Sequence, residues 1–505
     1  MKIFKILLIL ALTAAAAPGA ASEGAVDPAA WDALLLKYEH RGDAREKTEP
    51  PLSDDEAIRA GSWDKLALKY ENRYSRPGEG GALAIEELAS WWSVFDDKML
   101  EGLIMDALSD NRDLQAARSR VFEARAALGI SKSATLPWLD NTDTWTNNKS
   151  SDNSAGMGTR VEVTKLSIDA SWEIDIFGGR RESQNAAAAD LEASHAAMHA
   201  VWVALSSEVA LNYLSLRTLQ ERLHIVDLNI ALQEETRSML ASQYEAGLSD
   251  SLALNQAQYT IESTKASIPT IKANMESVMN ALAILTGRVP GSIEAMLDEP
   301  KPLPKARLGV LSGIPADALR RRPDIRAAER ALAAQISRKK SAERDLLPKF
   351  YLAGSIGLET LSGGSIFSGD SFGFAFGPRV TLPIFHGGAI RKNIQVQSAR
   401  TEQLLAAYEG TVLAAVADVR NALASCTQEL ERNRTLRAGI DAAASARDVA
   451  DDKYRNGLVD FNNVISAQTA LLSLEDQLVV SEGQIISNIV RIFKALGGGW
   501  DPLTE

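Results

Sequence analysis

The stretch that decides the fold is residues 164–177, which read TKLSIDASWEIDIF. Hydrophobic and polar side chains alternate through it at almost every position. Successive side chains of an extended strand point to opposite faces. One face therefore carries the apolar set Leu166, Ile168, Ala170, Trp172, Ile174 and Ile176, and the other the polar set Lys165, Ser167, Asp169, Ser171, Glu173 and Asp175. The alternation predicts a long amphipathic β-strand.

A second stretch of the same character lies at 371–383, where Phe372, Phe374, Phe376, Val380 and Leu382 alternate with small or polar residues. Weaker strand patterns precede the two stretches, and loops rich in Gly, Ser and Asn connect each pair. We therefore expect two β-hairpins, with strands at about 138–148, 162–177, 350–359 and 371–383.

The hairpins belong to a sequence repeat with a spacing of about 210 residues. The run Tyr244–Leu248 reappears as Tyr454–Leu458, and Ile176-Phe177 followed by two glycines reappears as Ile384-Phe385 near a second Gly pair. Two copies of one unit then account for most of the chain. The predicted organisation is a signal peptide (1–22), an N-terminal extension (23–87), a first repeat (88–287), a linker (288–316), a second repeat (317–497) and a C-terminal tail (498–505).

Each copy is otherwise helical. A first helix is expected at about 97–134 and 317–345, before the hairpin. After the hairpin, helical pattern runs from about 180 to 245 and from about 389 to 455, a length of ~100 Å at ~1.5 Å per residue. A glycine turn then leads into a returning helix, at about 251–286 and 461–496. The modest apolar faces are typical of helices that pack laterally as coiled coils.

Composition excludes several classes of protein. The chain has 505 residues, a net charge of −12 and a pI near 5.2, so nucleic acid is not expected as a partner. The single cysteine, Cys426, excludes an intrachain disulfide and a Cys-rich metal module. His195 and His199 have a spacing that can bind a metal on a helix, but no carboxylate motif lies between them. We expect no metal, no cofactor and no enzymatic activity.

The first residues have the layout of a secretory signal. Lys2 and Lys5 precede the apolar run 6–12, and small residues follow up to Ser22. We expect an exported protein without an N-terminal lipid anchor, because no cysteine follows the apolar run. No later stretch approaches 18 uninterrupted apolar residues, so membrane-spanning apolar helices are not expected.

The amphipathic strands allow two interpretations. They could cover a soluble domain, or they could form a membrane barrel with the apolar face toward lipid and the polar face toward a lumen. Four strands cannot close a barrel, and an open edge is not tolerated in lipid. Chains must therefore pool strands: two chains would give eight and a lumen filled by side chains, whereas three would give twelve and a passage.

The sequence resembles a known family, the TolC-like outer-membrane factors, over roughly residues 88–497. The residues that carry the resemblance are Trp91-Trp92 with Phe95, the run Arg320–Ile325, the run Trp172–Gly178, the run Leu382–Phe385 and the paired Tyr-x-x-Gly-Leu turns. The resemblance implies a homotrimer with a twelve-stranded outer-membrane β-barrel, four strands from each chain, joined to a long periplasmic α-helical barrel. The linker at 288–316 would contribute to a smaller mixed belt around the helices.

The same resemblance implies a function and partners. Substrate would pass from an inner-membrane pump and a periplasmic adaptor through the channel to the exterior, as in tripartite efflux or type I secretion. The tips of the helical hairpins would dock the adaptor, although glycine and aspartate also simply cap helix ends. These tips are Gly247, Leu248, Ser249 and Asp250 in the first copy and Gly457, Leu458, Val459 and Asp460 in the second.

The expected pore constriction consists of Asp460, Asn463 and Ser466. Several family members have carboxylates where this chain has Asn463 and Ser466. We therefore expect a gate that is less sensitive to cations, with Asp460 as its remaining acidic side chain. The residues expected to face lipid are Leu166, Ile168, Trp172, Ile174, Phe372, Phe374 and Phe376.

Two points stay open at the level of sequence. The motif Trp31-Asp32-x-Leu34 to Glu39 recurs 32 residues later as Trp63-Asp64-x-Leu66 to Glu71, and we interpret the pair as two short helices that clasp the helical barrel. The alternative function is an exported soluble coiled-coil scaffold or adaptor, which explains the long helices but leaves the lipid-like strand faces without a role.

Overall fold

The computed structural model describes residues 88–153, 155, 158–247, 250–304, 321–361 and 364–500. The predicted signal peptide and N-terminal extension, with its duplication, lie outside the described residues. So do residues 305–316 of the predicted linker, the first residues of the second repeat (317–320) and most of the C-terminal tail (501–505).

The strands form one antiparallel sheet of four, in the order β1-β2-β3-β4. Their bounds are Trp138–Lys149 for β1, Arg160–Ile174 for β2, Lys349–Leu361 for β3 and Phe372–Thr381 for β4. They lie where the alternation predicts strands, with two shorter ends. β2 stops at Ile174 rather than 177, because Ile176 N–H turns back to the Ile174 carbonyl (2.9 Å) and Gly178 is left-handed. β4 stops before Pro383, which has no N–H for the ladder.

Two helices of 67 residues each follow the hairpins: α8 (Gly179–Glu245) and α14 (Ala389–Arg455). Each begins directly after a glycine in the left-handed region, Gly178 or Gly388. Each ends before another such glycine, at φ 68° for Gly247 and 69° for Gly457. The sequence thus places both long helices almost residue for residue, because glycine turns mark both of their ends.

The returning helices differ between the copies. The second copy has one helix, α15 (Phe461–Ala495), whereas the first has two, α9 (Ser251–Lys265) and α10 (Ser267–Leu285). The prediction of a single helix at 251–286 is therefore wrong, because the helix is interrupted at Ala266, the residue between α9 and α10. Pro269 explains the break, because it cannot donate to the Lys265 carbonyl and its ring crowds that oxygen.

The helix predicted at 97–134 is also interrupted, into α6 (Lys98–Asp110) and α7 (Arg112–Ser133). Asn111 between them has an extended ψ of 133°; its side-chain oxygen accepts from Leu114 N–H, and its amide donates to the Leu285 carbonyl (both 3.0 Å). In the second copy α13 (Pro323–Arg344) starts later than 317, with proline at its first turn. The described residues also contain two one-turn segments, η1 (Trp91–Phe95) and α11 (Glu294–Leu297), and η3 (Gly369–Ser371) precedes β4.

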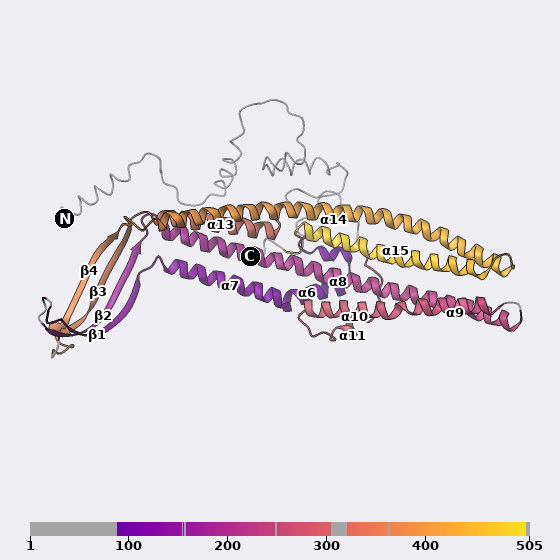
Figure 1. The fold of residues 1–505 in the computed structure, drawn as a ribbon, viewed down its shortest axis with the longest axis horizontal. Helices are drawn as coiled ribbons and strands as arrows, with labels where there is room; N and C mark the ends of the chain where they lie inside the picture. The colour runs from indigo at the N-terminus through magenta and orange to yellow at the C-terminus, as the bar shows by residue number, and fades with distance from the viewer. Residues whose placement is uncertain are drawn as a thin grey trace, which may run out of the picture. The chain divides into compact units, whose positions relative to one another are not determined.

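Helices from the two copies pack side by side. α7 and α13 both lie along α8, α13 also lies along α14, and α15 runs back along α14 (Figure 1). The strands continue from the ends of α7, α8, α13 and α14, while the Gly247 and Gly457 turns close the opposite ends of α8 and α14 (Figure 1). None of the helices in the described ranges is long and apolar enough to cross a membrane.

The largest core lies around η1, α6, α8 and α15. Trp91 is fully buried and its ring stacks on Phe493 at 5.6 Å. Beside it, the buried Tyr213 donates its hydroxyl to the Asp97 carboxylate at 2.6 Å. The pKa of Tyr213 is raised to about 12, mainly by burial and secondly by this hydrogen bond. This core ties the start of the first repeat to the end of the second.

Trp500, the last described residue, is also packed on the helices. Trp500 is buried, stacks on His199 at 4.8 Å and lies under the Arg326 guanidinium at 5.4 Å. His199 is thus a packing residue in this structure. No group of three or more His, Cys, Asp or Glu side chains that could hold a metal occurs among the described residues. Cys426 is buried in the core.

Candidate functional site

Three of the four strands, β2, β3 and β4, share one continuous apolar face. Directly opposed residues of antiparallel strands lie on the same face, so the register defines its members. They are Leu166, Ile168, Ala170, Trp172 and Ile174 of β2, Phe350, Leu352, Gly354, Ile356 and Leu358 of β3, and Phe372, Phe374, Phe376, Pro378 and Val380 of β4. Phe374 is 77% exposed and Phe376 73% exposed, so in one chain this face is not covered.

All seven side chains predicted to face lipid lie on this apolar face, and all except Leu166 are exposed. Leu166 is half-buried, opposite Leu358. On β1 the same face is partly polar, because Asn141 opposes Ile168 and Asp143 opposes Leu166. The Asn141 amide donates to the Asp143 carboxylate at 3.1 Å, so these two polar side chains pair with each other. Exposed apolar surface of this extent marks a membrane or protein contact.

The opposite face is polar. It carries Thr142 with Ser167, Thr144 with Lys165 and Glu359, and the row Glu173, Tyr351 and Arg379. The Ser167 hydroxyl donates to the Thr142 carbonyl at 3.2 Å or the Asp169 carboxylate at 3.1 Å. A sheet with one polar and one apolar face suits a wall between lipid and water.

Both edges of the sheet are unpaired. Among the described strands, β1 pairs with β2 alone and β4 pairs with β3 alone. Each edge therefore presents backbone N–H and C=O groups that need partners, and in lipid an unsatisfied group costs several kcal/mol. The sheet of one chain is an open segment that must join other strands before it can enter a membrane.

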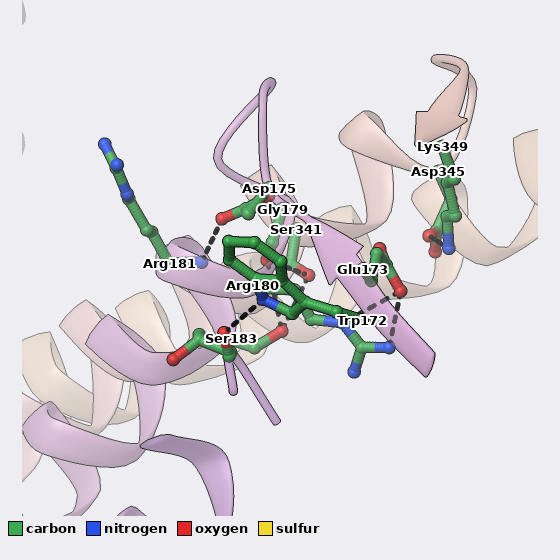
Figure 2. Close-up of polar contacts among 11 residues, drawn as sticks. Trp172, Glu173, Asp175, Gly179, Arg180, Arg181, Ser183, Ser341, Asp345 and Lys349 are labelled. Atoms are coloured by element: carbon green, nitrogen blue, oxygen red, sulfur yellow. Dashed lines mark hydrogen bonds and ion pairs between the residues drawn. The ribbon is translucent and has the colours of Figure 1, made fainter. Parts of the chain in front are cut away.

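A polar junction joins the sheet to the helices (Figure 2). The Glu173 carboxylate accepts from Arg180 at 2.7 Å, and the Asp175 carboxylate accepts from Arg181 N–H at 2.8 Å. Figure 2 shows these side chains between the end of β2 and the first turn of α8. The contacts hold the first turn of α8 against the end of β2.

The second repeat contributes to the same junction. The Ser341 hydroxyl donates to the Gly179 carbonyl at 3.1 Å and lies 2.9 Å from the Ser183 hydroxyl, while Lys349 pairs with Asp345 at 2.9 Å (Figure 2). A cavity of about 260 Å³ lies among these residues and is lined largely by charged and polar side chains. The junction therefore holds α8 and α13 together where both meet the sheet.

The two helical tips differ in detail although their sequences correspond. The Asp250 carboxylate accepts from Ala253 N–H at 3.1 Å and so caps α9. Asp460 precedes α15 in the same way, but its side chain makes no capping hydrogen bond. Leu248 and Ser249 lie outside the described residues, whereas Leu458 is 72% exposed. Gly247 and Gly457 are exposed and Val459 is half-buried.

The residues predicted to form the constriction lie on one tip. Asp460, Asn463 and Ser466 are all exposed, and the Asn463 amide donates to the Asp460 carbonyl at 3.2 Å. Below them, a small core of Leu240, Ala253, Ala257, Phe461 and Val464 joins the two tips. The Tyr454 hydroxyl adds a hydrogen bond to Gln243 at 3.3 Å. Sequence reasoning missed this core, because its members come from helices of both repeats.

A further polar link between the repeats was also not predicted. Arg222 of α8 contacts both carboxylate oxygens of Asp476 of α15, at 2.7 and 3.1 Å. The nearby Asn229 amide donates to Glu475 at 3.3 Å. The partners are about 250 residues apart in sequence, and no local pattern indicates such a pair.

Comparison with known proteins gives a consistent result. The family described as outer membrane efflux protein matches residues 103–288 and 314–498. The chain is 30% identical over 425 residues to the toluene efflux pump outer membrane protein TtgF of Pseudomonas putida, covering 82% of this chain and 86% of the relative. It is 31% identical over 424 residues to the pyoverdine export outer membrane protein OpmQ, also of Pseudomonas putida, covering 81% and 88%.

Solved structures agree with these relatives. The outer-membrane channel OprN superposes with a TM-score of 0.80 at 31% identity, covering 85% of this chain and 95% of the channel. The outer membrane protein VceC of Vibrio cholerae has the same fold, with a TM-score of 0.75 at 24% identity over 82% of this chain and 99% of VceC.

Proposed function

Because the chain belongs to the outer membrane efflux protein family, it is an outer-membrane channel of an efflux system, and we propose that three copies assemble to form the channel. Family membership confirms the resemblance to TolC-like factors and places the protein in the outer membrane, with its helical part in the periplasm. It also decides against the soluble scaffold, because the family is one of transport proteins and not of adaptors or enzymes.

The observation that carries the assembly is the four-stranded sheet with an exposed apolar face and two unpaired edges. Pairing β4 of one copy with β1 of the next satisfies both edges and closes the sheets into a ring. Three copies supply twelve strands, which leave a passage, whereas two copies supply eight and fill the lumen with side chains.

Conduction through this ring is passive. The polar faces of the sheets line a water-filled lumen, and α7, α8, α13, α14 and their returning helices extend it into the periplasm. Energy comes from an inner-membrane pump, which passes substrate through a periplasmic adaptor. The relatives named as efflux-pump outer membrane proteins support these two partners.

The tips around Gly247 and Gly457 dock the adaptor and close the resting channel. Asp460, Asn463 and Ser466 form the narrowest level, where Ser466 contributes hydroxyl groups instead of a ring of carboxylates. The exposed side chain of Asp460, which does not cap its helix, supports its place in this constriction, in contrast to Asp250, which caps its own helix.

The test is planar-bilayer conductance of the detergent-extracted protein, with the oligomer mass measured on the same preparation. A trimer that inserts and gives small, discrete currents is expected, because the tips hold the channel mostly closed. A monomer or dimer would overturn the three-copy assembly, and a protein extracted by salt alone that never inserts would overturn the channel.

A further inference from the structure

Near its helix side, the polar face of the sheet carries one row of three polar or charged side chains. Glu173 of β2, Tyr351 of β3 and Arg379 of β4 are direct cross-strand partners. Side chains in this relationship lie about 5 Å apart at their Cβ atoms, so the three form a continuous row across the sheet. Arg180 pairs with Glu173 of this row, and Lys349 lies two residues before Tyr351 on β3.

The cations of this region are not equivalent. Arg180 is paired with Glu173 at 2.7 Å and Lys349 with Asp345 at 2.9 Å. Arg379 has no carboxylate or hydrogen-bond partner within the described part of the chain; instead, its guanidinium carbon lies 5.0 Å from the centre of the Tyr351 ring. Glu173 and Asp345 are thus paired with other cations, and Arg379 makes no ion pair within the described part of the single chain.

The contact with Tyr351 leaves the hydrogen-bond donors of Arg379 available to an anion. The guanidinium has five N–H donors in a planar fork that matches a carboxylate, and its contact with the Tyr351 ring uses none of them in a hydrogen bond to the protein within the described residues. The ring below restricts the side chain, so less conformational entropy is lost on binding. Tyr351 also offers an aromatic edge that can contact a ring in the ligand.

We propose that Tyr351 and Arg379 form a binding site for aromatic carboxylates on the lumen wall. In the three-copy channel the site occurs three times at one level, where the strands meet the helices. The inference rests on the proposed function in one respect: the polar face of the sheet must line the passage. It adds a substrate class, organic anions with an aromatic ring, to a channel whose chain is acidic overall.

Binding can be tested without any current. The full-length protein in detergent is titrated with terephthalate and with succinate, and binding is followed by ligand-observed NMR. Terephthalate is expected to bind more tightly than succinate, because only terephthalate can use both the guanidinium and the Tyr351 ring.

Variants separate the two contributions. Arg379→Gln is expected to raise the Kd for terephthalate about tenfold, since a charge-assisted pair of hydrogen bonds is lost. Tyr351→Leu should remove the preference for terephthalate over succinate. The matched control is Lys165→Gln, which removes one positive charge from the same face where Lys165 opposes Glu359; it should leave both Kd values unchanged.

Three results would overturn the site: no binding to the wild-type protein, equal binding by Arg379→Gln, or an equal loss in Lys165→Gln. Size-exclusion chromatography of every variant shows whether the assembly is retained. If Arg379→Gln fails to assemble, Arg379→Lys is tested in its place, because it keeps the positive charge but loses the planar guanidinium. A protein that binds terephthalate through Arg379 but conducts no current would keep the site and refute the channel. Conduction without such binding would keep the channel and refute the site.

Discussion

Arg222 Nε lies 2.7 Å from Asp476 Oδ1 and Arg222 Nη2 lies 3.1 Å from Asp476 Oδ2, so a two-pronged ion pair connects the long helix of the first repeat to the returning helix of the second. Both side chains are about 30% exposed. The geometry matches the planar fork of arginine to a carboxylate, which is stronger than a single-contact pair. This pair holds α8 and α15 together between the central core and the tips.

Removing the pair should ease separation of the tips. We expect Arg222→Gln to raise the open probability of the channel up to about fivefold, the effect of losing a partly exposed pair of up to ~1 kcal/mol. Single-channel recording in planar bilayers measures it. Arg434→Gln is the control, because Arg434 pairs with Glu431 on the same helix and both side chains are largely exposed. Equal open probability in wild type and Arg222→Gln would show that the pair does not restrain opening.

The two tip aspartates should respond differently to substitution. Asp460→Ala is expected to weaken block of the current by divalent cations, because it removes the one carboxylate assigned to the constriction. Asp250→Ala should leave the block unchanged and lower stability by about 1 kcal/mol, since it removes the cap of α9. Single-channel block and thermal unfolding measure the two effects. Unchanged block in Asp460→Ala would remove Asp460 from the constriction.

Two glycines with nearly equal backbone angles offer a matched comparison. Gly287 has φ 70° and Gly457 has φ 69°, so alanine costs about 1 kcal/mol of strain at either position. A Cβ at Gly287 would also clash with the Asp110 carbonyl, whereas a Cβ at Gly457 would meet open space. Gly287→Ala should therefore lower the Tm clearly more than Gly457→Ala. A similar Tm for both variants would mean that the contact with Asp110 relaxes without cost.

The Tyr213–Asp97 hydrogen bond predicts a dependence on alkaline pH. The pKa of Tyr213 is raised to about 12 in the folded protein, from about 10 when unfolded. Because the pKa is higher in the folded protein, the contribution of Tyr213 to the free energy of unfolding is complete below pH 10 and is lost as the pH rises through 12. Tyr213→Phe should be less stable by about 1–3 kcal/mol at pH 8.

The stability difference between wild type and Tyr213→Phe should shrink between pH 10 and 12. Thermal unfolding at a series of pH values checks this, and the comparison removes the effect of the other tyrosines and lysines. A constant difference up to pH 12 would contradict the assigned pKa.

Much of the site was predictable because its signals are local. The strands follow from a period of two, and the 67-residue helices from glycine turns at their ends. The apolar face of the sheet likewise follows from alternation within each strand. The breaks at Asn111 and Ala266 were not predicted, although Pro269 gave a local signal for the second. At Asn111 the chain satisfies a long-range hydrogen bond to Leu285, which no window of sequence can reveal.

By itself, the sequence determined the strands, the long helices and the identity of the family, because periodicity and turn residues act over a few neighbouring positions. Only the tertiary structure decided that β2 pairs with β3 across the two repeats, that Trp500 packs on His199, that Arg222 meets Asp476 and that Arg379 lies over Tyr351 without a carboxylate. These relationships join residues that the chain separates by tens to hundreds of positions. They depend on which elements pack together, and that choice is made by the whole buried surface rather than by any one segment.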